Sequence, residues 1–169
     1  ICPTELLTYS DALKQLGEQA KDVAVIFASV DPERDTPELI GKYVRQFNPA
    51  FIGLTVTGDQ SLPIIKQQYR VVSAKAGQQS EQVYLVDHSA GTYWLDKEGE
   101  VAVFAPYGNT ATQIADDLKI SLKQALCRPR ASERKVSDGV IKKAIMSDNN
   151  LTIALSKGRI YEETLPLLE

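Results

Sequence analysis

The chain has 169 residues, enough for one ordinary domain with a hydrophobic core but little room for a second. Its 43% hydrophobic and 24% charged residues are close to the globular average, and its formal net charge of −3 argues against a nucleic-acid-binding protein that relies on overall positive charge. Two cysteines and one histidine exclude a disulfide framework and a self-contained metal site built from several Cys and His ligands. No apolar run approaches the roughly 18 residues that span a bilayer.

Residues 1–120 alternate between helical and strand patterns. Apolar residues at helical spacing predict a helix from about Thr4 to Gly17, and the apolar, β-branched run Val23–Val30 predicts a strand buried on both faces. The further elements expected are helices at 36–48, 62–71 and 110–126, strands at 51–56, 83–86, 92–95 and 101–105, a polar loop at 74–82 and a hairpin turn at 96–99. This order predicts an α/β fold with helices on both faces of a sheet.

The charge divides the chain into three parts. Residues 1–120 carry a formal net charge of −6, residues 121–145 carry +5, and residues 146–169 carry −2. The basic part lacks a sustained apolar period, so we expect a disordered linker there. In the last part, Leu151–Leu155 has a strand pattern followed by a turn and a helix-like end. Nothing follows on which this β–α start could pack, so we expect it to be truncated.

Cys2 stands directly before Pro3 at the start of the first expected helix. The helix dipole stabilises a thiolate at such a position, which makes the sulfur a better nucleophile and a better ligand for soft metals. The alternative is a cysteine without a role at a frayed chain end. Cys127, beside the basic segment, is expected to have no role.

His88 follows an expected strand, between Asp87 and Ser89. An imidazole at a strand end can bind a metal or transfer protons, with Asp87 as a hydrogen-bond partner of the ring. A surface histidine without a function is the alternative. The segment Asp31–Pro37 also follows a buried strand, at the sheet edge where α/β proteins tend to place their sites. A turn and a helix cap explain most of that segment equally well.

Taken together, four motifs resemble the Sco/SenC family of copper metallochaperones, which have a thioredoxin-like fold. The motifs are Ile1-Cys2-Pro3-Thr4 before a helix, Val30–Pro37 after a strand, Val86-Asp87-His88-Ser89, and the hairpin Trp94–Gly99. They occur in the family's order within about residues 1–120. The resemblance therefore covers the first of the three parts of the chain.

The resemblance implies a copper site. Family members combine a CxxxCP pair with a distant histidine, so Cys2 matches the second cysteine, both a metal ligand and the redox-active thiol, and His88 matches the histidine. Two thiolates and an imidazole suit Cu(I) and also accommodate Cu(II). The first cysteine would lie four positions before Cys2, so this chain is expected to carry two of the three ligands. Asp31 and Asp35 match the family's acidic motif and are expected to be structural or to contact a partner.

The resemblance also implies that the chain is a fragment. It begins with Ile1 in place of Met, so we expect a longer protein with a membrane tether upstream. In thioredoxin-like sheets the strand before the cysteine motif is central. We therefore expect residues 1–120 to form a thioredoxin-like domain that lacks its first, central strand and has exposed strand edges.

The implied function is delivery of copper to the binuclear copper site of cytochrome c oxidase, with the copper-site subunit as partner. The implied location is the periplasmic face of the bacterial inner membrane. Such a protein is a metallochaperone and not primarily an enzyme, although some members reduce disulfides. The main alternative is a thiol-disulfide oxidoreductase of thioredoxin-like fold, with Cys2 as one of a redox pair and His88 incidental.

Residues 146–169 resemble a different protein, the N-terminus of ATP phosphoribosyltransferase, which is a cytoplasmic enzyme of histidine biosynthesis. Met146–Arg159 carry the resemblance, and Lys157 and Arg159 match a motif near that enzyme's first strand. This segment is too short to hold two nucleotide-like substrates, so a transferase fragment is a further alternative only. The conflicting locations of the two families motivate the hypothesis that the chain joins products of neighbouring genes.

Overall fold

The computed structural model describes residues 2–56, 61–76, 85–88, 90–96, 99–127 and 151–157. Its helices and strands follow the alternation expected for an α/β fold. Their bounds are α1 Cys2–Leu16, the 3₁₀ helix η1 Gly17–Asp22, β1 Val23–Ser29, α2 Pro37–Phe47, β2 Ile52–Leu54, α3 Ser61–Gln68, β3 Ser73–Ala76, β4 Leu85–His88, β5 Gly91–Leu95, β6 Val101–Pro106, α4 Ala111–Cys127 and β7 Leu151–Lys157. Within these ranges no helix is both long and apolar enough to cross a membrane.

Most of the expected elements lie within a few residues of their observed bounds, and the polar loop at 74–82 is the exception. Ser73–Ala76 form β3, which pairs antiparallel with β4. The β3 side chains are exposed or half-buried, so the strand has no apolar run by which a sequence pattern could reveal it. The rest of the expected loop, residues 77–82, lies outside the described residues.

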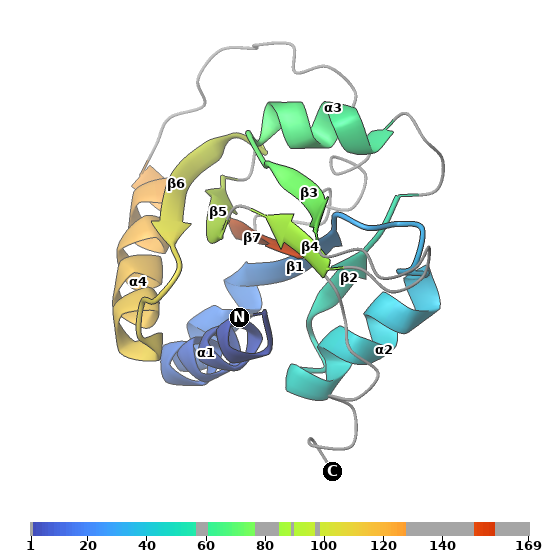
Figure 1. Cartoon of the computed structure of the whole chain (residues 1–169). Helices are drawn as coiled ribbons and strands as arrows, with labels where there is room; N and C mark the ends of the chain where they lie inside the picture. Colours follow the sequence, from blue (N-terminus) through green and yellow to red (C-terminus); the bar gives the residue numbers. More distant parts are fainter. Residues whose placement is uncertain are drawn as a thin grey trace.

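The main sheet has the strand order β2-β1-β7-β5-β6 among the described residues (Figure 1). β1 is parallel to β2 and to β7, whereas β5 is antiparallel to β7 and to β6. In the described sheet, residues 1–120 thus supply no central strand, as expected, but the exposed strand edges expected there are wrong. The strand from the end of the chain, β7, occupies the central position between β1 and β5. A partner so distant in sequence leaves no local pattern, which is why the sequence did not reveal the pairing.

The helices α1, α2 and α4 share one hydrophobic core with the sheet. Along β1, Val25 and Phe27 join this core, whereas Ile26 is buried on the opposite face, as the alternation of side chains in a strand requires. From β5, Trp94 joins the same core and is 2% exposed. On the opposite face, Tyr69, next to α3, meets Tyr93 with ring centroids 5.6 Å apart. Both faces of the sheet are thus covered, as expected.

The last helix, α4, ends at Cys127, one residue after the end expected for it, and thus overlaps the linker that the charge pattern predicted from residue 121. Residues 121–127 of the expected linker therefore belong to a helix. Residues 128–145 lie outside the described residues, as does Arg159, whereas Lys157 is the last residue of β7.

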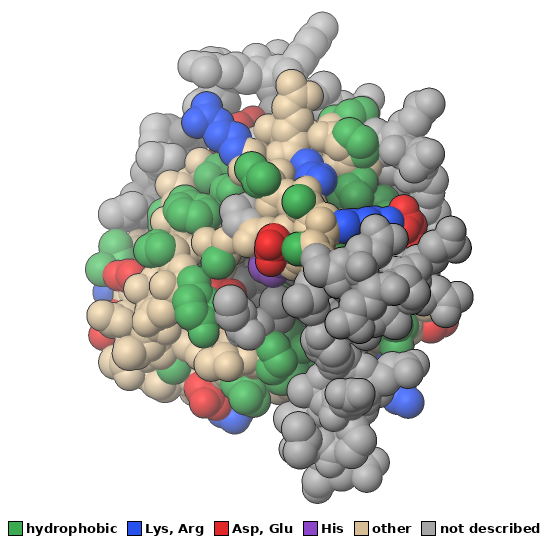
Figure 2. Space-filling view, in the orientation of Figure 1, with side chains coloured by type: hydrophobic (Ala, Val, Ile, Leu, Met, Phe, Trp, Pro, Cys, Tyr) green, Lys and Arg blue, Asp and Glu red, His purple; other side chains and the backbone are tan. Residues whose placement is uncertain are grey.

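An exposed row of hydrophobic side chains follows β6 and the turn after it. Its members are Val101, Val103, Phe104 and Tyr107, each between 38% and 51% exposed. Hydrophobic side chains are visible on the surface at this side of the molecule (Figure 2). β6 is the outer strand of the described sheet, and its residues include no charged side chain of the kind that commonly protects a sheet edge.

Candidate metal centre

Cys2 is the first residue of α1, which begins two residues before the start expected near Thr4. Pro3 follows it, where a proline costs the helix nothing because the first N–H groups have no partner within the helix. The Cys2 side chain itself lies outside the described residues. The backbone thus places the cysteine at the positive end of a fifteen-residue helix.

His88 is the last residue of β4, opposite Ser73 of β3, and it is half-buried. Its neighbour Asp87 is exposed and pairs with Ala74. Consecutive strand residues point to opposite faces, so the Asp87 side chain points away from the face on which the imidazole lies. The structure thus places His88 at the end of β4 and does not favour Asp87 as the partner that orients its ring.

A hydrogen bond between α1 and β5 holds the first turns of the helix that begins with Cys2. The Thr92 hydroxyl, fully buried in β5, donates to the Glu5 carboxylate at 3.1 Å. Glu5 is three residues after Cys2 and therefore lies one turn along the same side of α1. Burial raises the pKa of the Glu5 carboxyl, while the Thr92 hydrogen bond and the positive charge of His88 lower it. Glu5 is therefore a half-buried acidic group one turn after Cys2 on α1.

Glu5 was not predicted from the sequence as a residue of the site. Its only signal in the sequence is the spacing of three from Cys2, which places a carboxylate on the cysteine's side of a helix. A glutamate in a first helical turn is also favoured by the helix dipole alone, so the spacing does not distinguish a structural glutamate from a functional one.

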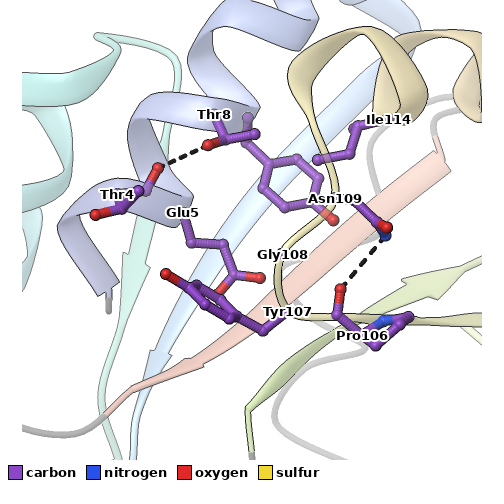
Figure 3. A pocket seen from close by; sticks show the side chains of 9 residues that line it. Thr4, Glu5, Thr8, Pro106, Tyr107, Gly108, Asn109 and Ile114 are labelled. Carbon is purple, nitrogen blue, oxygen red and sulfur yellow. Dashed lines mark hydrogen bonds between the residues drawn. The ribbon is translucent and has the colours of Figure 1, made fainter.

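Glu5 also points into a pocket of about 240 Å³ between α1 and the turn that joins β6 to α4 (Figure 3). The other residues that line the pocket are Thr4, Thr8, Tyr9, Pro106, Tyr107, Gly108, Asn109 and Ile114. Two of its polar groups are already engaged, since Thr8 donates to the Thr4 carbonyl at 2.8 Å and Asn109 donates to the Pro106 carbonyl at 3.3 Å. Among the residues that line the pocket, Glu5 is the acidic one.

A second hydrogen bond holds α1 against β5. The Trp94 indole N–H donates to the Tyr9 hydroxyl at 3.1 Å, between two side chains that are almost fully buried. Burial raises the pKa of Tyr9 to about 12, so this phenol is neutral throughout the physiological range. Two side chains of β5, Thr92 and Trp94, thus fix two successive turns of the helix that begins with Cys2.

Glu5→Gln tests the environment of this carboxyl. The folded-state pKa of Glu5 is raised above 4.5, so in the window above 4.5 the folded chain binds more protons than the unfolded chain. The free energy of unfolding of the parent should therefore fall relative to that of Glu5→Gln as the pH rises through this window. Urea unfolding of both proteins between pH 4 and pH 7 measures the difference. A difference that moves in favour of the parent would contradict a raised pKa.

The acidic segment after β1 is a buried structural cluster. Asp31 and Asp35 are each 4% exposed. Asp31 accepts a hydrogen bond from Arg34 Nε at 2.6 Å and forms an ion pair with the same guanidinium, while Asp35 accepts from the Ser29 hydroxyl. The Asp31 N–H donates to Ser29 Oγ at 3.0 Å. These contacts support the structural role expected for the two aspartates.

The helix that follows this segment starts as the sequence predicted. Thr36 is the N-cap of α2, and its hydroxyl accepts a hydrogen bond from the Leu39 N–H at 3.2 Å, with Pro37 at the first helical position. The acidic segment and this cap together fix the turn between β1 and α2.

Ser29→Ala separates a structural role of this cluster from a role in metal binding. We expect a loss of about 1–3 kcal/mol in the free energy of unfolding, because the change removes a hydrogen-bond donor to the buried Asp35 carboxylate. Thr8→Ala, which removes an exposed hydroxyl, is the matched control and should cost no more than about 0.5 kcal/mol. Copper affinity should not change in either variant. A Ser29→Ala protein of normal stability that binds copper poorly would instead place this cluster at the metal site.

Among the described side chains, no group of three or more His, Cys, Asp and Glu residues is close enough to hold a metal ion. The Cys2 thiol is not part of that set, because its side chain is not described. The described part of the chain thus brings one imidazole to this region and contains no complete metal cage of its own.

Comparison with known proteins identifies relatives of this chain. A SCO2-like protein of Rickettsia typhi is 35% identical over 101 residues, which are 59% of this chain and 49% of that protein. The human mitochondrial protein SCO2 homolog is 33% identical over 121 residues, which are 70% of this chain and 45% of that protein. The chain thus spans about half the length of these curated relatives.

Two solved structures are similar to this chain in both fold and sequence. Copper-bound ScoI of Arabidopsis thaliana has a TM-score of 0.66 and 32% identity, covering 73% of this chain and 76% of that one. Copper-bound ScoI of Bradyrhizobium japonicum has a TM-score of 0.62 and 36% identity, covering 70% and 74%. The α/β fold is therefore the thioredoxin-like fold of Sco proteins, as expected. The SCO1/SenC family model matches residues 1–123, and the chain belongs to this family.

Proposed function

We propose that this chain is the greater part of a Sco-type copper chaperone domain that binds copper through Cys2 and His88. The observation that carries the proposal is the match of the SCO1/SenC family model to residues 1–123, with Cys2 at the first position of α1 and His88 at the end of β4. Two relatives of the same fold have copper bound, which supports copper as the cargo.

The chemistry of the two side chains suits this cargo. A thiolate at the N-terminus of α1 is stabilised by the helix dipole, and Cu(I) is a soft ion that prefers thiolate ligands. The His88 imidazole adds a ligand that both Cu(I) and Cu(II) accept. A cysteine four positions before Cys2, in a longer protein, would complete a site of two thiolates and one imidazole.

We propose further that the copper is delivered to the binuclear copper site of cytochrome c oxidase, whose copper-site subunit is the partner. The place of delivery would be the periplasmic face of the bacterial inner membrane, with a tether upstream of this chain. Exposed Leu7 on α1 and Tyr107 beside the pocket are available for contact with such a partner near the site.

A transfer experiment tests the proposal. The copper-loaded protein, extended upstream to include the cysteine four positions before Cys2, is mixed with the apo copper-binding domain of the oxidase subunit. We expect copper to leave the chaperone and to appear in the oxidase domain, up to two ions per domain, as measured by the copper content of each protein after separation. Rapid reduction of a disulfide in that domain by a protein that holds no copper would favour the thiol-disulfide oxidoreductase.

A further inference from the structure

We propose that an ion pair between Glu33 and Lys75, called here the tether, positions the hairpin β3–β4 and, through it, the imidazole of His88. Glu33 lies in the turn after β1, and Lys75 lies on β3. Both are positioning residues, which act on copper through His88 and do not bind it themselves. The effect on copper rests on the proposed function, whereas the effect on the hairpin does not.

The hairpin that carries His88 needs support from the rest of the domain. In the described structure, β3 and β4 form a two-stranded sheet that is separate from the five-stranded sheet (Figure 1). The two strands pair only from Ser73 opposite His88 to Ala76 opposite Leu85. A two-stranded hairpin is at best marginally stable in water by itself. Contacts between this hairpin and the rest of the domain therefore determine how firmly the imidazole is held.

The tether reaches the face of the hairpin on which the imidazole lies. Lys75 is directly opposite Val86, which is two residues before His88 on β4. Directly opposite residues of an antiparallel pair share a face, and so do residues two apart along one strand. On this face, Lys75 Nζ lies 2.7 Å from Glu33 Oε2. The ion pair therefore joins the His88 face of the hairpin to the turn after β1.

The turn that carries Glu33 is itself firmly held. Asp31 and Asp35, on either side of Glu33, are each 4% exposed. The backbone N–H groups of Arg34 and Asp35 donate to the Asp31 carbonyl at 3.2 and 3.1 Å. The Arg34 side chain also donates from Nε to the Asp31 carboxylate at 2.6 Å. Glu33 thus extends from a buried, hydrogen-bonded turn, which makes it a suitable anchor for the hairpin.

A second lysine contacts β3 close to the tether. Lys66 of α3 donates from Nζ to the Ser73 carbonyl at 3.4 Å, and Ser73 is the residue opposite His88. The turn after β1 and α3 thus contact β3 at positions two residues apart. Because the Lys66 contact remains when the tether is broken, loss of the tether should loosen the hairpin without releasing it.

Reversing the two charges, singly and together, tests the tether. Glu33→Lys and Lys75→Glu each bring like charges together, whereas the double variant restores an opposite pair. Cu(I) is titrated against a competing chelator in the protein extended upstream through the cysteine four positions before Cys2. We expect each single variant to lower the Cu(I) affinity about two- to fivefold, the effect of an exposed ion pair. The double variant should regain the affinity and the Cu(II) absorption spectrum of the parent.

Hydrogen exchange of the β3 and β4 amides reports on the hairpin without copper. In the metal-free chain, each single variant should exchange these amides about two- to fivefold faster than the parent, and the double variant should exchange them at the parent rate. The difference between parent and single variants should shrink at high salt, because salt screens exposed charges.

Lys119→Glu is the matched control. Lys119 forms an exposed ion pair with Asp116 on α4 at 3.0 Å, and its substitution changes the net charge by as much as Lys75→Glu does. It should leave the copper affinity and the hairpin exchange as in the parent. The single variants also control for charge. By charge alone, Lys75→Glu would attract a copper cation and Glu33→Lys would repel it, whereas loss of the tether lowers the affinity in both.

Three results would overturn the proposal. Opposite shifts of the copper affinity in the two single variants would show an effect of charge alone. Unchanged hairpin exchange in both, or a double variant that exchanges as fast as they do, would show that the ion pair does not hold the hairpin. An equal loss of affinity on Lys75→Glu in a His88→Ala background would show that the tether does not act through His88. A protein that binds no copper in any form would count against the proposed function alone, because hydrogen exchange still reports on the tether.

Discussion

Replacing His88 with alanine should lower the affinity for Cu(I) by more than about tenfold, and for Cu(II) by at least as much. Loss of a partner that only supports a ligand already costs about 10–100-fold in metal affinity, so loss of a ligand should cost no less. His88 is also the only histidine in the chain, so no other imidazole can replace it. Titration against a competing chelator, without oxygen for Cu(I), measures both affinities.

Asp87→Ala is the matched control for this change. Asp87 is the neighbouring residue on β4, but it is exposed and faces the other side of the strand. We expect its substitution to leave both copper affinities within about twofold of the parent, because no ligand is lost. Equal affinities in His88→Ala and the parent would refute the assignment of His88 as a ligand.

Trp94→Ala should produce the largest loss of stability among single substitutions near the site. The indole is 2% exposed in the core shared by α1, α2, α4 and the sheet, and its N–H bonds the Tyr9 hydroxyl. Truncation of a buried tryptophan costs about 3–5 kcal/mol, a large part of the stability of a domain this size. Urea unfolding followed by circular dichroism measures the loss.

Trp94→Phe separates the two contributions of this residue. Phenylalanine keeps most of the buried hydrophobic volume but cannot donate to Tyr9, so we expect a smaller loss of about 1–3 kcal/mol. If the two variants are equally destabilised, the hydrogen bond to Tyr9 dominates and burial contributes little. If neither is destabilised, Trp94 does not hold α1 against β5 as the structure indicates.

The sequence predicted the elements whose signals are local. The start of α1 at Cys2 and Pro3, the buried strand from Val23 and the cap at Thr36 all depend on neighbouring residues, and each lies within a few residues of its expected place. The hairpin turn is similar: the Asp96 N–H donates to the Glu100 carbonyl at 2.9 Å, and Gly99 adopts the positive φ of 82° that favours glycine.

What the sequence did not predict depends on contacts between distant residues. β3 has little apolar character and exists because it pairs with β4. The central place of β7 depends on ladders to β1 and β5, so its strand pattern was recognised but its partners were not. Glu5 could not be singled out from the sequence, because its hydrogen-bond partner Thr92 lies far along the chain. For the site, sequence resemblance thus supplied the candidate ligands, and the structure added Thr92 and Trp94, which hold the helix that begins with Cys2.

The placement of β7 also changes how the three parts of the chain are understood. The segment that resembles the start of ATP phosphoribosyltransferase contributes a strand to the same sheet as the Sco-like part. Leu151 and Lys157 pair with the first and last residues of β1, so the ladder runs the whole length of that strand. Whatever the origin of this segment, removing it should affect the strands that support Cys2.

The measurement that tests the copper proposal most directly is an anaerobic Cu(I) titration against a competing chelator. It compares this chain with the chain extended upstream through the cysteine four positions before Cys2, each with and without Cys2→Ser. The proposal predicts tight one-to-one binding in the extended protein, much weaker binding in this chain, and loss of binding on Cys2→Ser in both. A folded extended protein that binds no Cu(I) tightly, or that binds it equally well with Cys2→Ser, would contradict the copper site.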